Sequence, residues 1–139
     1  MEGLMITAAA LAPAVVLFYY IYRKDKFQQE PVKELLKAFG YGVISIFVSL
    51  MISVPLGRLG FYVDEPVTFW GAVASSFFGA AIPEEIAKFL MFWLLVRSST
   101  YFNEHMDGIV YPTFVALGFA ALENIMYLFT NYDAWVSVG

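Results

Sequence analysis

The sequence has 139 residues, of which 60% are hydrophobic and only 14% are charged, and its formal net charge is −4. A soluble domain carries about 25% charged residues, so this composition indicates a protein that lies in lipid. The absence of cysteine excludes disulfides and thiolate metal sites, and the single histidine, His105, excludes a two-histidine metal site built from this chain alone. No basic patch is interleaved with aromatic residues, so we expect no nucleic-acid partner.

Four apolar segments are each near the ~20 residues that a helix needs to cross the hydrocarbon. They cover residues 4–22, 35–56, 68–96 and 108–129. Their apolar runs are continuous rather than alternating, which favours helices over the strands of a membrane barrel. We therefore expect an all-α protein: one polytopic membrane domain over residues 1–139, with about four transmembrane helices and lipid as its surroundings.

The basic residues predict the orientation of these segments. Five lie between the first and second segments: Arg23, Lys24, Lys26, Lys33 and Lys37. On the opposite side of the second segment the loop contains only Arg58. The positive-inside rule thus predicts a multi-pass cell-membrane protein with its amino terminus outside and the loop 23–37 in the cytoplasm.

Charged residues interrupt the third and fourth apolar segments. Glu84, Glu85 and Lys88 lie within the third, and Glu123 and Asn124 lie within the fourth. An ionised side chain at the centre of a membrane helix costs about 2.5–3.5 kcal/mol by insertion scales, so we expect these groups to face protein or water. The alternative is that they are paired charges that merely hold helices together.

Helical spacing predicts where these groups point. One face of the third segment shares small residues and charged residues at intervals of four: Ala72, Ser76, Ala80, Glu84 and Lys88. Small residues permit close helix approach, so this face is expected to point into the bundle, with a kink at Pro83 that leaves both glutamates at a new helix start. With a rise of ~1.5 Å per residue, Glu84 lies ~18 Å and Glu123 ~22 Å from the cytoplasmic ends of their helices, so the two can meet.

Neighbouring carboxylates in a dry site suit general acid–base chemistry. One of them takes a proton from water and later returns it to a leaving amine, while Lys88 or Asn124 stabilises the developing oxyanion or orients the water. A serine nucleophile at Ser75 or Ser76 has no base in a suitable pattern. A metal site on Glu84, Glu85 and Glu123 is an alternative, although oxygen ligands alone are a weak signal.

The residues that carry this pattern also resemble a known family. Residues 84–88 are similar to the EExxK motif of the PrsW intramembrane proteases, and residues 107–111 and 118–124 resemble its DGIxY and GFAxxEN blocks. That family is similar to the CAAX prenyl-proteases and bacteriocin-immunity membrane proteins. It is associated with site-1 cleavage of a membrane-spanning anti-sigma factor during envelope stress.

The resemblance implies an intramembrane endopeptidase with a glutamate-activated water and a single-pass membrane protein as substrate. It implies these site residues: Glu84 and Glu85 as catalytic, with Lys88, Asp107, Glu123 and Asn124 in support. Asp107 before a glycine is equally typical of a helix cap, and His105 is expected at the surface.

Family members continue through further helices with additional histidines, so we expect a chain that corresponds to the amino-terminal part of a longer fold and is inactive alone. The cofactor stays open: none, or a divalent metal that those histidines would complete. Two other functions also stay open, a proton- or ion-coupled transporter subunit and a non-catalytic binding or immunity protein. The oligomeric state is not predicted.

Overall fold

The computed structural model describes residues 2–24, 30–63 and 65–130. Its elements are all helical: α1 (Glu2–Lys24), α2 (Val32–Arg58), α3 (Phe69–Ala74), the π-helix η1 (Ser75–Ala81), α4 (Ile82–Ser98) and α5 (Asp107–Thr130). Each of the four apolar segments coincides with a helix or helical run, which confirms the expected all-α class. The predicted cytoplasmic loop includes residues 25–29, which lie outside the described residues.

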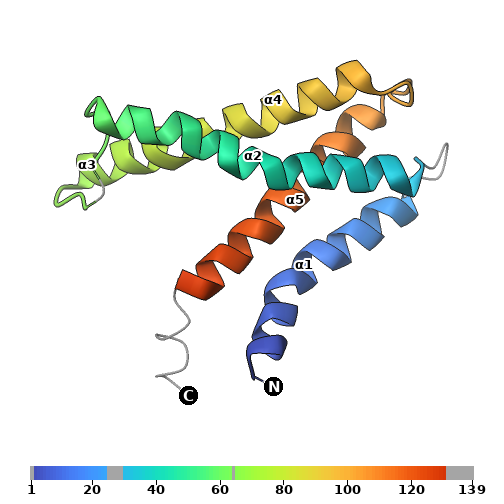
Figure 1. Cartoon of the computed structure of the whole chain (residues 1–139), viewed down its shortest axis with the longest axis horizontal. Coiled ribbons are helices and arrows are strands. Elements are labelled where there is room, and N and C mark those ends of the chain that lie inside the picture. Colours follow the sequence, from blue (N-terminus) through green and yellow to red (C-terminus); the bar gives the residue numbers. More distant parts are fainter. Residues whose placement is uncertain (1, 25–29, 64, 131–139) are drawn as a thin grey trace.

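The helices form two arms that cross at α2 and α5 (Figure 1). In the first arm α1 runs beside α5, and the start of α1 and the end of α5 lie on the same side of the molecule. In the second arm α2 runs beside the continuous helical stretch of α3, η1 and α4, which returns in the opposite direction. This arrangement brings the fourth apolar segment against all the other long helices.

The crossing of α2 and α5 depends on two glycines. A Cβ at Gly42 would collide with the backbone carbonyl of Val115, and a Cβ at Gly118 would collide with that of Phe39. The two helices therefore touch through their backbones, as small residues allow in membrane helix pairs. This contact fixes where α5 sits along α2.

Aromatic and aliphatic side chains fill the bundle on one side of that crossing. Tyr111 and Phe114 of α5 are fully buried against Leu35 of α2 and Leu95 of α4. Phe18 of α1 packs edge-on to Phe114 with ring centroids 4.5 Å apart. Through this core, α1, α2 and α4 all pack against the half of α5 that follows the 99–106 loop.

The third segment changes its helix type at Pro83. Its helix widens into the π-helix η1 directly before this proline, and the Ile82 amide donates to the carbonyl of Phe77, five residues earlier. Proline has no amide hydrogen to continue an α-helical ladder, and a wider turn accommodates it. A new α-helix, α4, begins at Ile82 with both glutamates in its first turn, as expected, while the kink stays a prediction.

The predicted small-residue face of the third segment is not a helix–helix contact within the described residues. Ala72, Ser76 and Ala80 are all exposed. The η1 turn takes more residues per turn than an α-helix, so spacing by four does not hold a constant face through it. Instead, Gly79 packs against the ring of Tyr62, and further along the run the side chains of Pro83 and Ala87 are buried.

Two helices of the described part, α2 and α5, are long and apolar enough to cross a membrane by length and composition. The helix α4 alone has 17 residues and carries the charged motif, and it completes a long run only together with α3 and η1. The expectation that the first and third segments also span stays a prediction.

Candidate active site

The charged motif lies in the first turn of α4, directly after the π-turn. Glu84 and Glu85 follow Pro83 there, and Lys88 lies one turn later. Pro83 is fully buried against the rest of the bundle, which fixes the orientation of this turn. The side chains of Glu84 and Lys88 are 27% and 20% exposed, so both are largely enclosed by protein.

Lys88 is the centre of the polar contacts in this site. Its Nζ donates to Oε1 of Glu85 at 2.5 Å and lies 4.0 Å from Oε2 of Glu84. The same ammonium lies 4.7 Å from the ring centroid of Phe119 on α5. The expected Glu84–Lys88 pair is therefore present, but the shorter contact of Lys88 is with Glu85.

Glu123 enters the site from α5, one turn after Phe119. Its charge acts on the carboxylate of Glu84, and so do the charges of Lys88 and Glu85. α4 and α5 run in opposite directions (Figure 1), and the contact between them in this region joins Lys88 to the ring of Phe119. Glu84 and Lys88 are therefore paired on α4, while the meeting of Glu84 with Glu123 stays a prediction.

Glu85 differs from Glu84 in its surroundings. Its side chain is 74% exposed, and its described contact is the hydrogen bond from Lys88. Glu85 points outward and does not line a neighbouring wall of the bundle, because it lies about 100° around the helix from Glu84. Its role in the structure is to hold the lysine from outside.

Two of the predicted supporting residues lie elsewhere. Asn124 donates from Nδ2 to the carbonyl of Ala10 at 3.1 Å, so it joins α5 to α1. Asp107 is 2% exposed, and its Oδ2 accepts the backbone amides of Asn103 and Glu104 at 2.9 and 2.7 Å. It is 16 residues from Glu123 on the same helix, a separation of about 24 Å, so the structure places it outside the carboxylate group.

The serines and the histidine of the sequence have no place in this group either. The Ser75 hydroxyl donates to the carbonyl of Val63 at 2.6 Å and accepts its amide at 3.3 Å, which fastens the preceding loop. Ser76 lies on the outer face of η1. His105 is exposed in the loop before α5, as expected.

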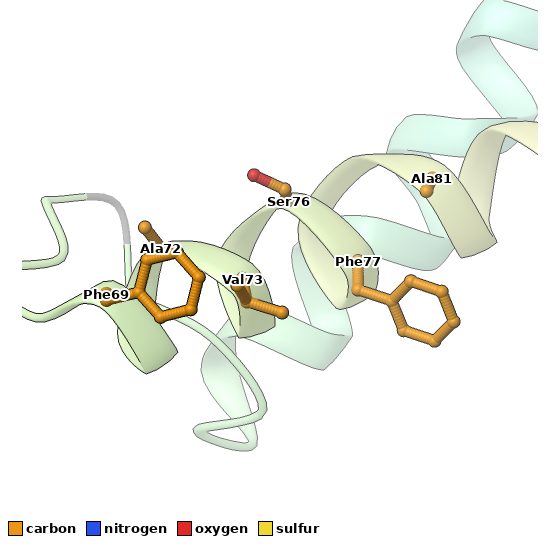
Figure 2. A pocket seen from close by; sticks show the side chains of 6 residues that line it. All are labelled: Phe69, Ala72, Val73, Ser76, Phe77 and Ala81. Carbon is orange, nitrogen blue, oxygen red and sulfur yellow. The ribbon is translucent and has the colours of Figure 1, made fainter.

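An open hollow of about 380 Å³ lies along α3 and η1, before the charged motif. Its lining is mostly apolar: Phe69, Ala72, Val73, Ser76, Phe77 and Ala81. Figure 2 shows these side chains on one helical stretch, with Phe69 at one end and Phe77 and Ala81 toward the other. The hollow contains no carboxylate and is distinct from the Glu84 group.

One buried polar contact was not found from the sequence. The Tyr111 hydroxyl donates to Oε2 of Glu30 at 2.5 Å, and both residues are buried. They are 81 positions apart, so no local pattern pairs them. The sequence offered two signals for this contact. Glu30 precedes a proline at the start of one apolar run, and Tyr111 lies inside another.

A row of serines on α2 was also missed. Ser45, Ser49 and Ser53 are buried, and their hydroxyls bond back to carbonyls three residues earlier. They are self-satisfied and small, so they allow other helices to pack closely on α2. Their spacing by four was the signal that could have found them.

Within the described residues, the carboxylates of Glu84 and Glu123 do not supply enough ligands to hold a metal ion. Glu84 and Glu123 are two oxygen donors from facing helices, but the described residues contain no group of three histidine, cysteine or acidic side chains suitable for a metal. A catalytic zinc site normally has three protein ligands. The described residues therefore do not make a complete metal site.

The family model described as PrsW family intramembrane metalloprotease matches residues 30–137. The chain belongs to the PrsW family. The matched region contains α2 to α5 and with them every residue of the carboxylate group, and the family is described as one of membrane peptidases.

Curated relatives agree with this membership. The chain is 38% identical over 126 residues to Protease PrsW of Geobacillus kaustophilus, which covers 91% of this chain and 53% of the relative. It is 36% identical over 123 residues to Protease PrsW of Bacillus subtilis (88% and 53%) and 34% identical over 128 residues to that of Oceanobacillus iheyensis (92% and 56%). The chain spans about half the length of these PrsW relatives. No solved structure matches it.

Proposed function

We propose that this chain supplies the catalytic carboxylates of an intramembrane endopeptidase that hydrolyses a membrane-spanning protein of the anti-sigma-factor type. The observation that carries the proposal is the cluster of Glu84, Glu85 and Lys88 in a PrsW-family bundle, with Lys88 against Phe119 of α5, one turn before Glu123. An anti-sigma factor is proposed as substrate because the PrsW family, to which the chain belongs, is associated with the cleavage of such proteins.

In the proposed mechanism Glu84 is the general base. It removes a proton from a water molecule, whose oxygen attacks the carbonyl carbon of the scissile peptide. The ammonium of Lys88, held 4.0 Å from Glu84, stabilises the negative charge that develops on the carbonyl oxygen. Glu84 then returns the proton to the amide nitrogen, and the carbon–nitrogen bond breaks to release an amine and a carboxylate.

The other acidic residues have different tasks in this proposal. Glu123 presents a second carboxyl group beside Glu84, which can orient the water between the two helices. Glu85 holds Lys88 through its short hydrogen bond and does not touch the reacting atoms. Asp107 orders the loop before α5, and Asn124 fixes α5 to α1. No step in this sequence passes through a metal ion.

The proposed topology places the carboxylates within the membrane. The loop that joins α1 to α2 would be cytoplasmic, with the start of α1 and the end of α5 on the outer side, because basic residues concentrate in residues 23–37. The shared side of those two helix ends is consistent with this arrangement (Figure 1). The whole of residues 1–139 would then be one membrane domain.

The test uses two proteins in liposomes that contain a single-pass substrate of the anti-sigma type. One is the 139-residue chain, and the other is a chimera in which this chain replaces the matching region of the Geobacillus kaustophilus relative. We expect cleavage by the chimera and none by the chain alone. In the chimera Glu84→Gln should lower the rate at least about 100-fold, the usual contribution of a general base, and Glu85→Gln should lower it less.

The matched control is Glu65→Gln, an exposed glutamate of the loop before α3. Thermal unfolding is measured for every variant. A chimera whose Glu84→Gln variant cleaves at the parental rate, or loses its fold instead of its activity, would show that the carboxylates are packing groups and not catalytic ones.

A further inference from the structure

Phe119 and Lys88 form the one described side-chain contact that joins the charged motif of α4 to an uncharged group of α5. The ring of Phe119 is 5% exposed, so it is enclosed by the bundle. The ammonium of Lys88 lies 4.7 Å from its centroid, within the ~6 Å range of a cation–π interaction. The face of an aromatic ring is electron-rich, and it attracts a cation more strongly where water is scarce.

The position of the ring matters because lysine is a flexible side chain. A lysine in a membrane helix tends to extend toward the nearest water and take its charge with it. Here Glu85, which holds the ammonium from one side, is itself 74% exposed. Without the ring, only the longer ion pair with Glu84, at 4.0 Å, would oppose an outward movement of the Glu85–Lys88 pair.

We propose that Phe119 is a positioning residue that keeps the Lys88 ammonium inside the site, between Glu84 and the ring, through a cation–π interaction. The inference rests on the proposed function for the task of Lys88, the stabilisation of the oxyanion. Phe119 also lies one turn from Glu123, so the same contact holds this part of α5 against the first turns of α4.

The first test is independent of cleavage. The full 139-residue chain with ¹⁵N,¹³C-labelled lysine is placed in nanodiscs, and the NMR signals of Lys88 are assigned by Lys88→Arg. We expect the ε-methylene protons of Lys88 to be shifted upfield by the ring current of Phe119. The exchange of its ammonium protons with water should be slow, because the group is enclosed.

Fluorinated phenylalanines at position 119 separate electrostatics from packing. Each added fluorine weakens the negative face of the ring with little change in its size. We expect the ammonium exchange rate to rise stepwise along the mono-, di- and trifluoro series, by about two- to thirty-fold in total for an interaction of this kind. Phe119→Tyr should keep the parental rate and Phe119→Leu should reach the fast limit.

The matched control is Phe89→Leu, next to Lys88 in sequence but 64% exposed. It should leave the exchange rate unchanged. Unshifted ε-methylene signals in the parent, or equal exchange rates along the fluorinated series, would overturn the proposal.

In the chimera, Phe119→Leu should lower kcat with little change in KM, whereas Phe119→Tyr should keep the parental kcat. A Phe119→Leu variant that keeps its kcat would also overturn the positioning role. A chimera that never cleaves counts against the proposed function alone, because the exchange rates still decide the role of Phe119.

Discussion

The close crossing of α2 and α5 offers a sharp test of the fold. In Gly42→Ala the new methyl group would meet the backbone carbonyl of Val115, which no side-chain rotation can relieve. The helices must move apart, and overpacking of this kind costs about 1–3 kcal/mol. Alanine also favours a helix over glycine by about 0.5–1 kcal/mol, so the two effects oppose each other.

Gly40→Ala is the matched control, because Gly40 lies in the same helix and a Cβ there meets nothing within 4 Å. It should gain the helix term alone. We therefore expect Gly42→Ala to be less stable than Gly40→Ala by about 1–3 kcal/mol. The free energies of unfolding are measured by denaturant titration in mixed micelles. Equal stabilities of the two variants would refute the backbone contact.

Two further changes probe the loop end of the bundle. Tyr111→Phe removes the hydroxyl that donates to buried Glu30 and should lower the free energy of unfolding by about 1–3 kcal/mol. The control Tyr101→Phe, at an exposed tyrosine of the 99–106 loop, should leave the free energy of unfolding almost unchanged. Equal losses in the two variants would contradict the buried hydrogen bond. Asp107→Ala should cost a similar ~1–3 kcal/mol, because two loop amides lose their acceptor. In the chimera it should slow cleavage far less than Glu84→Gln, and an equal loss of kcat would return Asp107 to the catalytic group.

The sequence predicted the helices well because their apolar runs are long and continuous, although prolines such as Pro55 and Pro112 lie within them. The run 108–129 became α5 within one residue at each end. The sequence also predicted the pairing of Glu84 with Lys88, because residues four apart lie on the same face of an α-helix. These features depend on local composition and on distance along one helix axis.

What the sequence did not predict depends on contacts between helices. The π-turn at Ser75–Ala81 changed the faces of the third segment, so the small-residue stripe lies outside and Gly42 and Gly118 make the close approach instead. The hydrogen bond of Tyr111 to Glu30 joins residues from distant segments. Spacing rules assume a constant turn, and they carry no information about which helix lies opposite.

The glycine crossing also influences how far Glu123 can move. Glu123 is five residues beyond Gly118, about 7.5 Å along the axis, whereas Thr130 at the end of α5 is about 18 Å beyond it. If α5 tilts about its contact with α2, Glu123 therefore moves about 40% as far as the end of the helix. A change in bilayer thickness that displaces the end of α5 would shift this carboxylate by less than half as much.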